Sequence, residues 1–237
     1  LHLSIRRQRQ MCIRDSKEAS KQDIDEIDIR VMVTAKLDGL AAMLREDKLL
    51  VTRGDGIHGN DISSSFTKGV VDAGNGISGV GELVMTTDYF ETHLKKLGYA
   101  HPRNICVGVV NSDDVNDDFL KALKDGAVRF VPYSTLDHWE GSFTELIENH
   151  DIVQQQMIES CQYPTDGVVA EITHTELKSL LGATSHHNRW QIAIKQRSET
   201  KQASVKSITW QTKRTGRVTP VLEVAPIKLS GATVRRV

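Results

Sequence analysis

The sequence has little cysteine, few aromatic residues and no long apolar run. Its three cysteines, Cys12, Cys106 and Cys161, stand singly among 237 residues. This scatter excludes both a disulfide framework and a CxxC zinc site, and it indicates a reducing compartment. No apolar stretch approaches the roughly 20 residues that a membrane helix needs. With 26% charged and 39% hydrophobic residues, the composition predicts a soluble globular protein in the cytoplasm, with no membrane partner.

An excess of one charge sign is also absent, because 30 Lys and Arg oppose 31 Asp and Glu. The balance excludes an overall polycation, but it hides an uneven distribution. Residues 17–194 are acidic, with 16 basic and 28 acidic side chains, whereas residues 195–237 carry ten basic and two acidic side chains. A basic end joined to an acidic body suits a partner that presents phosphates at that end. A solvated basic tail is the alternative that charge alone leaves open.

Residues 1–16 differ in composition from the rest of the chain. They carry four Arg and one Asp and show no apolar periodicity. A transit peptide would have such a composition, but RRQRQMCIRDS resembles translated sequencing adaptor, so we expect 1–16 to be non-native and exclude it from the fold. The last residues, VRRV, stop inside an expected strand, and the chain is therefore expected to be a fragment.

Periodicity predicts an α+β fold. Alternation at 30–36 predicts a strand with Val31, Val33 and Ala35 on one face. LLVT, GVGELVM, DGVVAEI and WQIAIKQ are further expected strands. Helices are expected at about 87–97, at about 116–125, from Ser142 and from Thr173, the last two opened by capping boxes with Glu145 and Glu176. Strands and helices mix without a βαβ rhythm, while short strands and turns from 205 onward predict a small β barrel.

The first candidate for chemistry is Lys36, in the tetrapeptide KLDG. A lysine can act as a nucleophile and form a phosphoramide or a Schiff base when its surroundings lower its pKa. Taken alone, a lysine before an Asp-Gly turn more often marks a strand end with a solvated ammonium. The neighbouring motifs decide between these interpretations.

Six further motifs follow KLDG along the chain. They are TRGDG at 52–56, GEL at 81–83, HPRN at 101–104, TDGVV at 165–169, WQIAIK at 190–195 and RTGRVTPV at 214–221. In this order they resemble the covalent nucleotidyltransferases, most closely the NAD-dependent DNA ligases of bacteria and viruses, with KLDG, TRGDG, RGE, NPRN, DGVV, WAxAxK and RTGxxTPV elements. The resemblance covers about 30–237. It implies a nucleotidyltransferase domain (the ATP-grasp-like adenylation domain of DNA ligases) over 17–200 and the N-terminal part of an OB-fold domain over 201–237.

The resemblance also implies a role for each motif residue. Lys36 would attack the α-phosphate of NAD and hold AMP as a phosphoramide, and Asp38 would contact the ribose or orient Lys36. The other residues implied to contact the nucleotide are Arg53, Glu82, Arg103, Tyr133, Asp166 and Lys195. Glu82 and Asp166 are also implied as Mg²⁺ ligands, and Asp166 would hold either the metal or Lys36. Clustered cations and a metal suit the spread negative charge of a phosphoryl-transfer transition state.

The implied reaction continues on DNA. AMP would pass to the 5′-phosphate of nicked double-stranded DNA, and the 3′-hydroxyl would displace it to seal the backbone. The residues expected to grip DNA phosphates, in a monomeric protein, are Lys213, Arg214, Arg217, Arg235 and Arg236.

Four positions depart from the family pattern. Thr34 replaces a glutamate two residues before the lysine, Val80 replaces the arginine of RGE, Asn111 replaces a second arginine after PRN, and Glu171 replaces the lysine of DGVVIK. Glu171 adds repulsion where phosphate charge would gather. The four changes leave open a divergent viral-type ligase with rearranged contacts and a nick-binding remnant without catalysis. An ATP-dependent DNA or RNA ligase of the same superfamily is a separate alternative.

Overall fold

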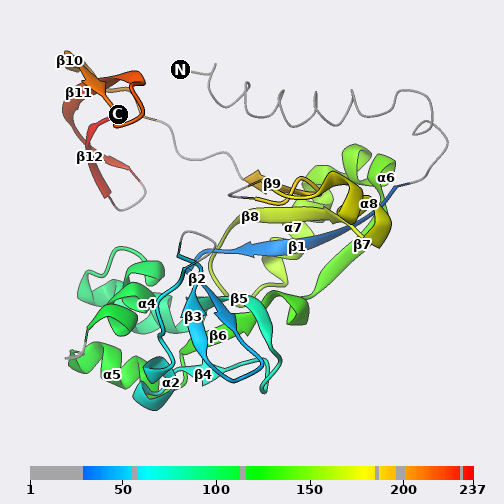
Figure 1. Ribbon diagram of the computed structural model, residues 1–237. Helices are drawn as coiled ribbons and strands as arrows, with labels where there is room; N and C mark the ends of the chain where they lie inside the picture. The colour runs from blue at the N-terminus through cyan, green and yellow to red at the C-terminus, as the bar shows by residue number, and fades with distance from the viewer. Residues whose placement is uncertain (1–28, 55–57, 113–115, 185–186, 196–200, 230–231) are drawn as a thin grey trace, which may run out of the picture.

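The computed structural model describes residues 29–54, 58–112, 116–184, 187–195, 201–229 and 232–237 (Figure 1). The adaptor-like segment 1–16 lies outside the described residues. The described residues form three open sheets with helices packed on two of them, which confirms the α+β prediction. No described helix has the length and apolarity to cross a membrane.

Sheet A has four antiparallel strands in the order β7-β1-β8-β9. They are β1 (Arg30–Leu37), β7 (His138–Ser142), β8 (Thr165–Ile172) and β9 (Gln191–Lys195). Alternation along β1 buries Val31, Val33 and Ala35, as predicted. Val31 and Val33 pack with Val153 and Met157 of helix α7 (His150–Glu159). Because side chains alternate across a strand, Lys36 points to the face opposite that core.

Sheet B has five strands in the order β3-β2-β5-β6-β4. They are β2 (Leu40–Leu44), β3 (Leu50–Thr52), β4 (Val71–Asp72), β5 (Gly79–Met85) and β6 (Val128–Pro132). The neighbouring helical segments are α2 (Ser64–Lys68), α3 (Thr87–Tyr89), η1 (Phe90–Leu94), η2 (Lys95–Leu97), α4 (Pro102–Asn111) and α5 (Asp117–Lys124). Residues of α4, η1 and sheet B share the largest core, with Leu50, Leu83, Ile105 and Phe130 fully buried.

Residues 201–237 supply the C-terminal sheet, with β10 (Val205–Thr212), β11 (Val218–Leu229) and β12 (Ala232–Arg236). The strands are antiparallel, as the all-β prediction for this end requires. In the described residues the sheet is open and does not close into a barrel. Every residue of β10 is exposed.

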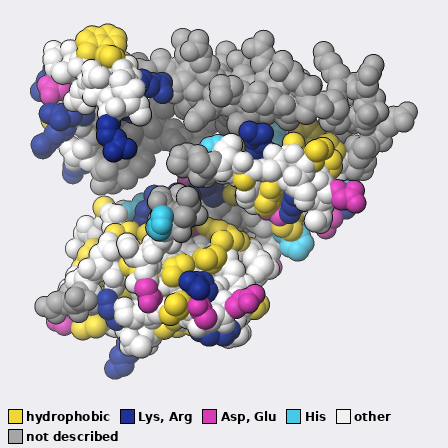
Figure 2. All heavy atoms as spheres, in the orientation of Figure 1, with side chains coloured by type: hydrophobic (Ala, Val, Ile, Leu, Met, Phe, Trp, Pro, Cys, Tyr) yellow, Lys and Arg dark blue, Asp and Glu magenta, His cyan; other side chains and the backbone are white. Residues whose placement is uncertain are grey.

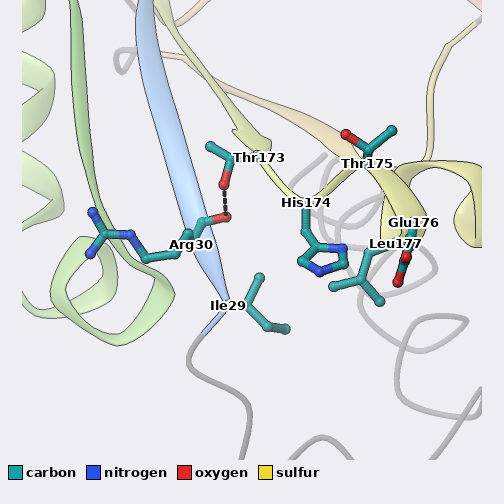
Figure 3. A pocket seen from close by; sticks show the side chains of 7 residues that line it. All are labelled: Ile29, Arg30, Thr173, His174, Thr175, Glu176 and Leu177. Carbon is teal, nitrogen blue, oxygen red and sulfur yellow. Dashed lines mark hydrogen bonds between the residues drawn. The ribbon is translucent and has the colours of Figure 1, made fainter.

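Several local predictions need correction. The helix from Ser142 divides at Asn149 into α6 (Phe143–Glu148) and α7, although its capping box with Glu145 is confirmed. The capping box at Thr173 is wrong, because helix α8 (Thr175–Leu181) begins later, after His174. The hydroxyl of Thr173 instead donates to the carbonyl of Arg30 on β1, 3.3 Å away (Figure 3). Strands β2, β4, β6 and β7 and helices α2 and α4 were not predicted.

Candidate functional site

The residues predicted to contact the nucleotide lie around the junction of sheets A and B. The segment Lys36–Gly39 leaves the end of β1 and enters β2, so it joins the two sheets (Figure 1). Asp166 and Lys195 lie on sheet A, while Glu82 lies on β5 of sheet B. Motifs separated by more than 100 residues therefore surround one turn of the chain.

A bulge in sheet A brings Lys36 and Asp166 together. Ala35 pairs with Val168 and Leu37 with Thr165, so two residues of β8 oppose Lys36 alone. The extra residue re-aims the local side chains, and Lys36 Nζ donates to Asp166 Oδ1 at 2.7 Å.

Gly167 makes this bulge sterically possible. Its φ of +144° lies in the region that favours glycine, and an added Cβ would overlap the carbonyl oxygen of Ile194 on β9. The close approach of β9 also sets Lys195 opposite Gly167, from where its ammonium reaches Asp166 Oδ2 at 3.2 Å.

Asp166 thus holds two lysines at once. Partial burial alone would raise the pKa of Asp166, but the hydrogen bonds and charges of Lys36 and Lys195 outweigh it and keep the pKa below its ordinary value. The Lys195 side chain is 60% exposed and the Lys36 side chain 26%. The arrangement leaves one excess positive charge, which suits an anionic ligand.

The turn after Lys36 is clamped by the N-terminus of α4. Asp38 Oδ1 lies 2.5 Å from the guanidinium of Arg103, whose Nε also donates to the carbonyl of Gly39 at 2.9 Å. The backbone N–H of Asp38 donates to the carbonyl of Pro164 at 2.8 Å, just before β8. A side chain at Gly39 would overlap the carbonyl oxygen of Leu83. The turn is therefore fixed from three directions.

Glu82 is the buried carboxylate of the site, with 6% of the residue exposed. Its oxygens accept hydrogen bonds from the N–H of Gly39, at 3.3 Å, and from the hydroxyl of Tyr133. Burial raises the pKa of Glu82, although these hydrogen bonds and the charges of Lys36 and Arg103 oppose the shift.

Tyr133 follows β6, in the 3₁₀ turn Tyr133–Thr135. Burial and the neighbouring Glu82 carboxylate raise the pKa of Tyr133, and the positive charge of Arg53 acts in the opposite direction. The side chain of Arg53 is exposed at the end of β3. Arg53 and Tyr133 therefore lie within electrostatic reach of one another on the sheet B side of the junction.

The carboxylates of Glu82 and Asp166 have the oxygen chemistry that Mg²⁺ prefers. No group of three or more His, Cys, Asp or Glu side chains that could hold a metal is found in the described part of the chain. Mg²⁺ usually keeps several waters and binds one or two carboxylates plus substrate phosphates. These residues therefore fit a magnesium ion that arrives with a nucleotide better than a metal held by the protein alone.

The four departures from the motif pattern lie on different elements of the fold. Thr34 lies on β1, two residues before Lys36 and on the same face. Val80 is 59% exposed on β5, and Asn111 is the last residue of α4.

Glu171 has local partners. Lys178 of α8 donates to it at 2.9 Å and Gln191 of β9 at 2.6 Å, and Lys178 also lies 4.5 Å from the centre of the Trp190 ring. The negative charge of Glu171 is therefore paired with Lys178 rather than free to repel a phosphate.

The predicted DNA-contacting residues fall into two groups on the C-terminal sheet. Lys213, Arg214 and Arg217 belong to the turn between β10 and β11, which the bonds Lys213 N–Arg217 O and Gly216 N–Lys213 O close. Arg235 and Arg236 lie on β12, where Arg236 is 3.4 Å from Glu223. Figure 2 shows Lys and Arg side chains gathered over these strands.

A separate hollow of about 380 Å³ lies at the start of β1 (Figure 3). Its lining residues are Ile29, Arg30, Thr173, His174, Thr175, Glu176 and Leu177. None of the predicted site residues lines it, so it is distinct from the junction site.

Sequence reasoning missed two residues of the junction. His101, whose imidazole contacts Asp38, could have been found from its place before Pro102, because a polar residue before a helix-starting proline is typical of a helix cap. The bulge at Gly167 could have been suspected from an Asp-Gly pair inside an apolar strand.

The fold and the site define an α+β protein with a carboxylate held between two lysines at the junction of two sheets. The chain is 50% identical over 222 residues to a DNA ligase of Desulfatibacillum aliphaticivorans, a match that covers 93% of this chain and 34% of that protein. DNA ligases of Psychromonas ingrahamii and Shewanella baltica are 42% and 40% identical over 223 residues each, with 93% of this chain and 34% of each relative covered. No family model matches.

The chain is therefore homologous to DNA ligases. It spans about a third of the length of these curated relatives.

Proposed function

We propose that this chain is the nucleotidyltransferase part of a DNA ligase that uses NAD and seals nicks through a lysyl-AMP intermediate. The observation that carries the proposal is the triad of Lys36, Asp166 and Lys195, in which a lysine nucleophile is aimed by a carboxylate that a second cation also holds. The homology to DNA ligases supports the same conclusion.

In the proposed first step, Lys36 Nζ forms a bond to the α-phosphorus of NAD and the P–O bond to nicotinamide mononucleotide breaks. The ammonium must lose a proton before attack, and Asp166 Oδ1, 2.7 Å away, would orient the amine toward the phosphorus. Lys195 and Arg103 provide positive charge beside the phosphates.

The nucleoside would be held by the residues around the turn. Asp38 and Glu82 offer carboxylate oxygens to ribose hydroxyls, and Tyr133 offers an aromatic face to the base. Arg53, exposed near Tyr133, is the cation for the 5′-phosphate side. Magnesium bound with the nucleotide would shield phosphate charge, and Glu82 and Asp166 are the residues that would hold it.

The choice of NAD over ATP rests on the resemblance of TRGDG, HPRN and RTGRVTPV to elements of NAD-dependent ligases. An ATP-dependent DNA or RNA ligase is the alternative. Labelled NAD and ATP offered side by side, with Mg²⁺, would separate the two by which donor labels the protein.

The second and third steps need DNA, and the proposed partner is nicked double-stranded DNA bound by a monomer. The described residues 201–229 and 232–237 would be the start of an OB-fold domain whose basic side chains contact phosphates. AMP then moves from Lys36 to the 5′-phosphate, and the 3′-hydroxyl forms the phosphodiester and expels AMP.

The proposal is tested by intact-mass detection of the AMP adduct. The assay protein is this chain joined to a family N-terminal module that recognises the nicotinamide half, incubated with NAD and Mg²⁺. The wild type should gain one AMP, and Lys36→Ala should gain none. Lys95→Ala is the matched control, because Lys95 pairs with Glu91 on a surface helix. An unlabelled wild type contradicts the proposal.

The nick-binding remnant is the rival, because Glu171 replaces a lysine of the family pattern. For a remnant, nick binding persists without an adduct, and Glu171→Lys raises adduct formation. An adduct on the wild-type chain excludes this rival.

A further inference from the structure

The imidazole of His101 is fixed at the start of α4. His101 is the N-cap residue, with extended backbone (φ −156°, ψ 135°), and its Nδ1 accepts the backbone N–H of Arg103 at 3.2 Å. Pro102, the next residue, has no N–H to offer. The ring therefore satisfies a free donor at the helix start and cannot turn without losing that bond.

The second ring nitrogen faces the turn after Lys36. His101 Nε2 lies 3.3 Å from Asp38 Oδ2. Because Nδ1 accepts a hydrogen bond, it carries no proton, and the single proton of the neutral ring must be on Nε2. The contact thus sets the Nε2 side of the ring beside a carboxylate oxygen.

Asp38 consequently has a side-chain nitrogen from the beginning of α4 beside each of its oxygens. Arg103 lies against Oδ1 and His101 against Oδ2, and the Asp38 side chain is 14% exposed. The Arg103 side chain is 47% exposed, so it is also within reach of an arriving anion. When Arg103 turns toward a phosphate its contact with Asp38 weakens, whereas a neutral imidazole has no net charge to draw it away.

We propose that His101 is a positioning residue. Its Nε2–H tautomer holds the Asp38 carboxylate in the orientation that contacts the ribose, which leaves Arg103 available to the phosphates. The proposal rests on the proposed function, because it assigns His101 a part in the same adenylation step. His101 acts through Asp38 and touches no reacting atom.

The tautomer is tested on the 237-residue chain by ¹⁵N NMR of the histidine rings at alkaline pH, where the ring is neutral. The expected His101 spectrum has a protonated Nε2 and an unprotonated Nδ1, and the Nε2 resonance should move in Asp38→Asn. A protonated Nδ1, or an Nε2 signal indifferent to Asp38→Asn, overturns the inference whether or not the chain is a ligase.

The positioning role is tested by the single-turnover rate of AMP-adduct formation at saturating NAD. In His101→Asn the shorter side chain still caps α4 but does not reach Asp38, so the melting temperature should be retained while the rate falls about tenfold. In an Asp38→Asn background the same change should have no further effect, because contacting residues are coupled. His150→Asn is the matched control, since His150 contacts Asp151 at 3.1 Å at the start of α7 and should leave the rate unchanged.

The outcomes separate the two proposals. A wild type that forms no adduct contradicts the proposed function. If the wild type forms the adduct, two results overturn the role of His101. One is a full rate in His101→Asn, and the other is an equal loss of rate with Asp38 present and with Asp38→Asn.

Discussion

At the scale of single residues, the carboxylates of Asp166 and Glu82 have pKa values shifted in opposite directions. Asp166 is half-buried between two lysines, and their charges lower its pKa, whereas Glu82 is buried beside a tyrosine and its pKa is raised. Asp166 is therefore suited to holding cations, while Glu82 is the carboxylate whose ionised form is destabilised by burial. This difference predicts how stability responds to pH.

Glu82→Gln should change the pH dependence of folding. The folded protein holds the Glu82 proton more tightly than the unfolded chain does, so ionisation removes stability as pH rises from the ordinary pKa of 4.5 through the raised pKa. Glutamine does not ionise. As the pH rises through this range, the melting temperature of the variant should therefore increase relative to that of the wild type. Thermal unfolding from about pH 4 to about pH 8 measures it, and parallel curves would contradict the prediction.

Motif reasoning found the residues of the site and the pairing of Asp166 with Lys36, but not every contact around them. Lys36, Asp38, Glu82, Arg103, Tyr133, Asp166 and Lys195 are all at the junction of the two sheets. The pairing of Glu171 with Lys178 could not be predicted, because it depends on how α8 packs against sheet A. A charge that looks unfavourable in the sequence is neutralised by a contact that only the fold creates.

At the scale of elements, the bulge between β1 and β8 is the feature that sets the position of Asp166 relative to Lys36. Without the bulge, Asp166 would be directed differently relative to Lys36, because a shift of one residue in the pairing moves each side chain to the opposite face of the sheet. The bulge depends on Gly167, whose φ and close approach to β9 admit no side chain.

Gly167→Ala should therefore destabilise the protein by about 3 kcal/mol, from backbone strain and overlap with Ile194, and abolish AMP-adduct formation. Gly98→Ala is the control, because Gly98 also has positive φ (+91°) but an added Cβ meets nothing within 4 Å. It should cost about 1 kcal/mol and leave the adduct intact. Urea unfolding and the adduct assay give both readouts, and equal losses in the two variants would refute the argument.

Strands β1, β3, β5, β8 and β9 were predicted from the sequence, whereas β2, β4, β6 and β7 were not. β4 has two residues and owes its pairing to β6, so no periodicity could show it. α4 was hidden because its sequence, PRNICVGVVN, mixes β-branched residues and a glycine with the helix signal. Packing of Ile105, Cys106 and Val109 into the core of sheet B stabilises it as a helix.

At the scale of the whole molecule, the distribution of charge is more informative than its total. The formal net charge is −1, yet the C-terminal sheet carries Lys213, Arg214 and Arg217 in one turn. Phosphate binding by such side chains releases counterions and makes affinity dependent on salt.

Replacing Arg214 and Arg217 together by alanine should weaken binding to nicked DNA of any sequence and lower the salt slope by about 2. Arg236→Ala should have a smaller effect, because Arg236 is already near Glu223. Fluorescence anisotropy at several salt concentrations measures the slope, with Arg45→Ala as the control, since Arg45 pairs with Asp47 on the body. An unchanged slope in the double variant would show that the turn does not contact phosphates.

The junction between the sheets also has a consequence for the order of folding during synthesis. Sheet B is complete within residues 40–132, whereas sheet A joins β1 to strands that end at 142, 172 and 195. A ribosome that has released residue 132 has made everything sheet B needs, but Lys36 still lacks Asp166 and Lys195. Non-local pairing of this kind forms late, so Lys36 receives its partners only when β9 has emerged. An unfinished chain would thus present Lys36 without the carboxylate and the second lysine that complete the junction in the folded protein.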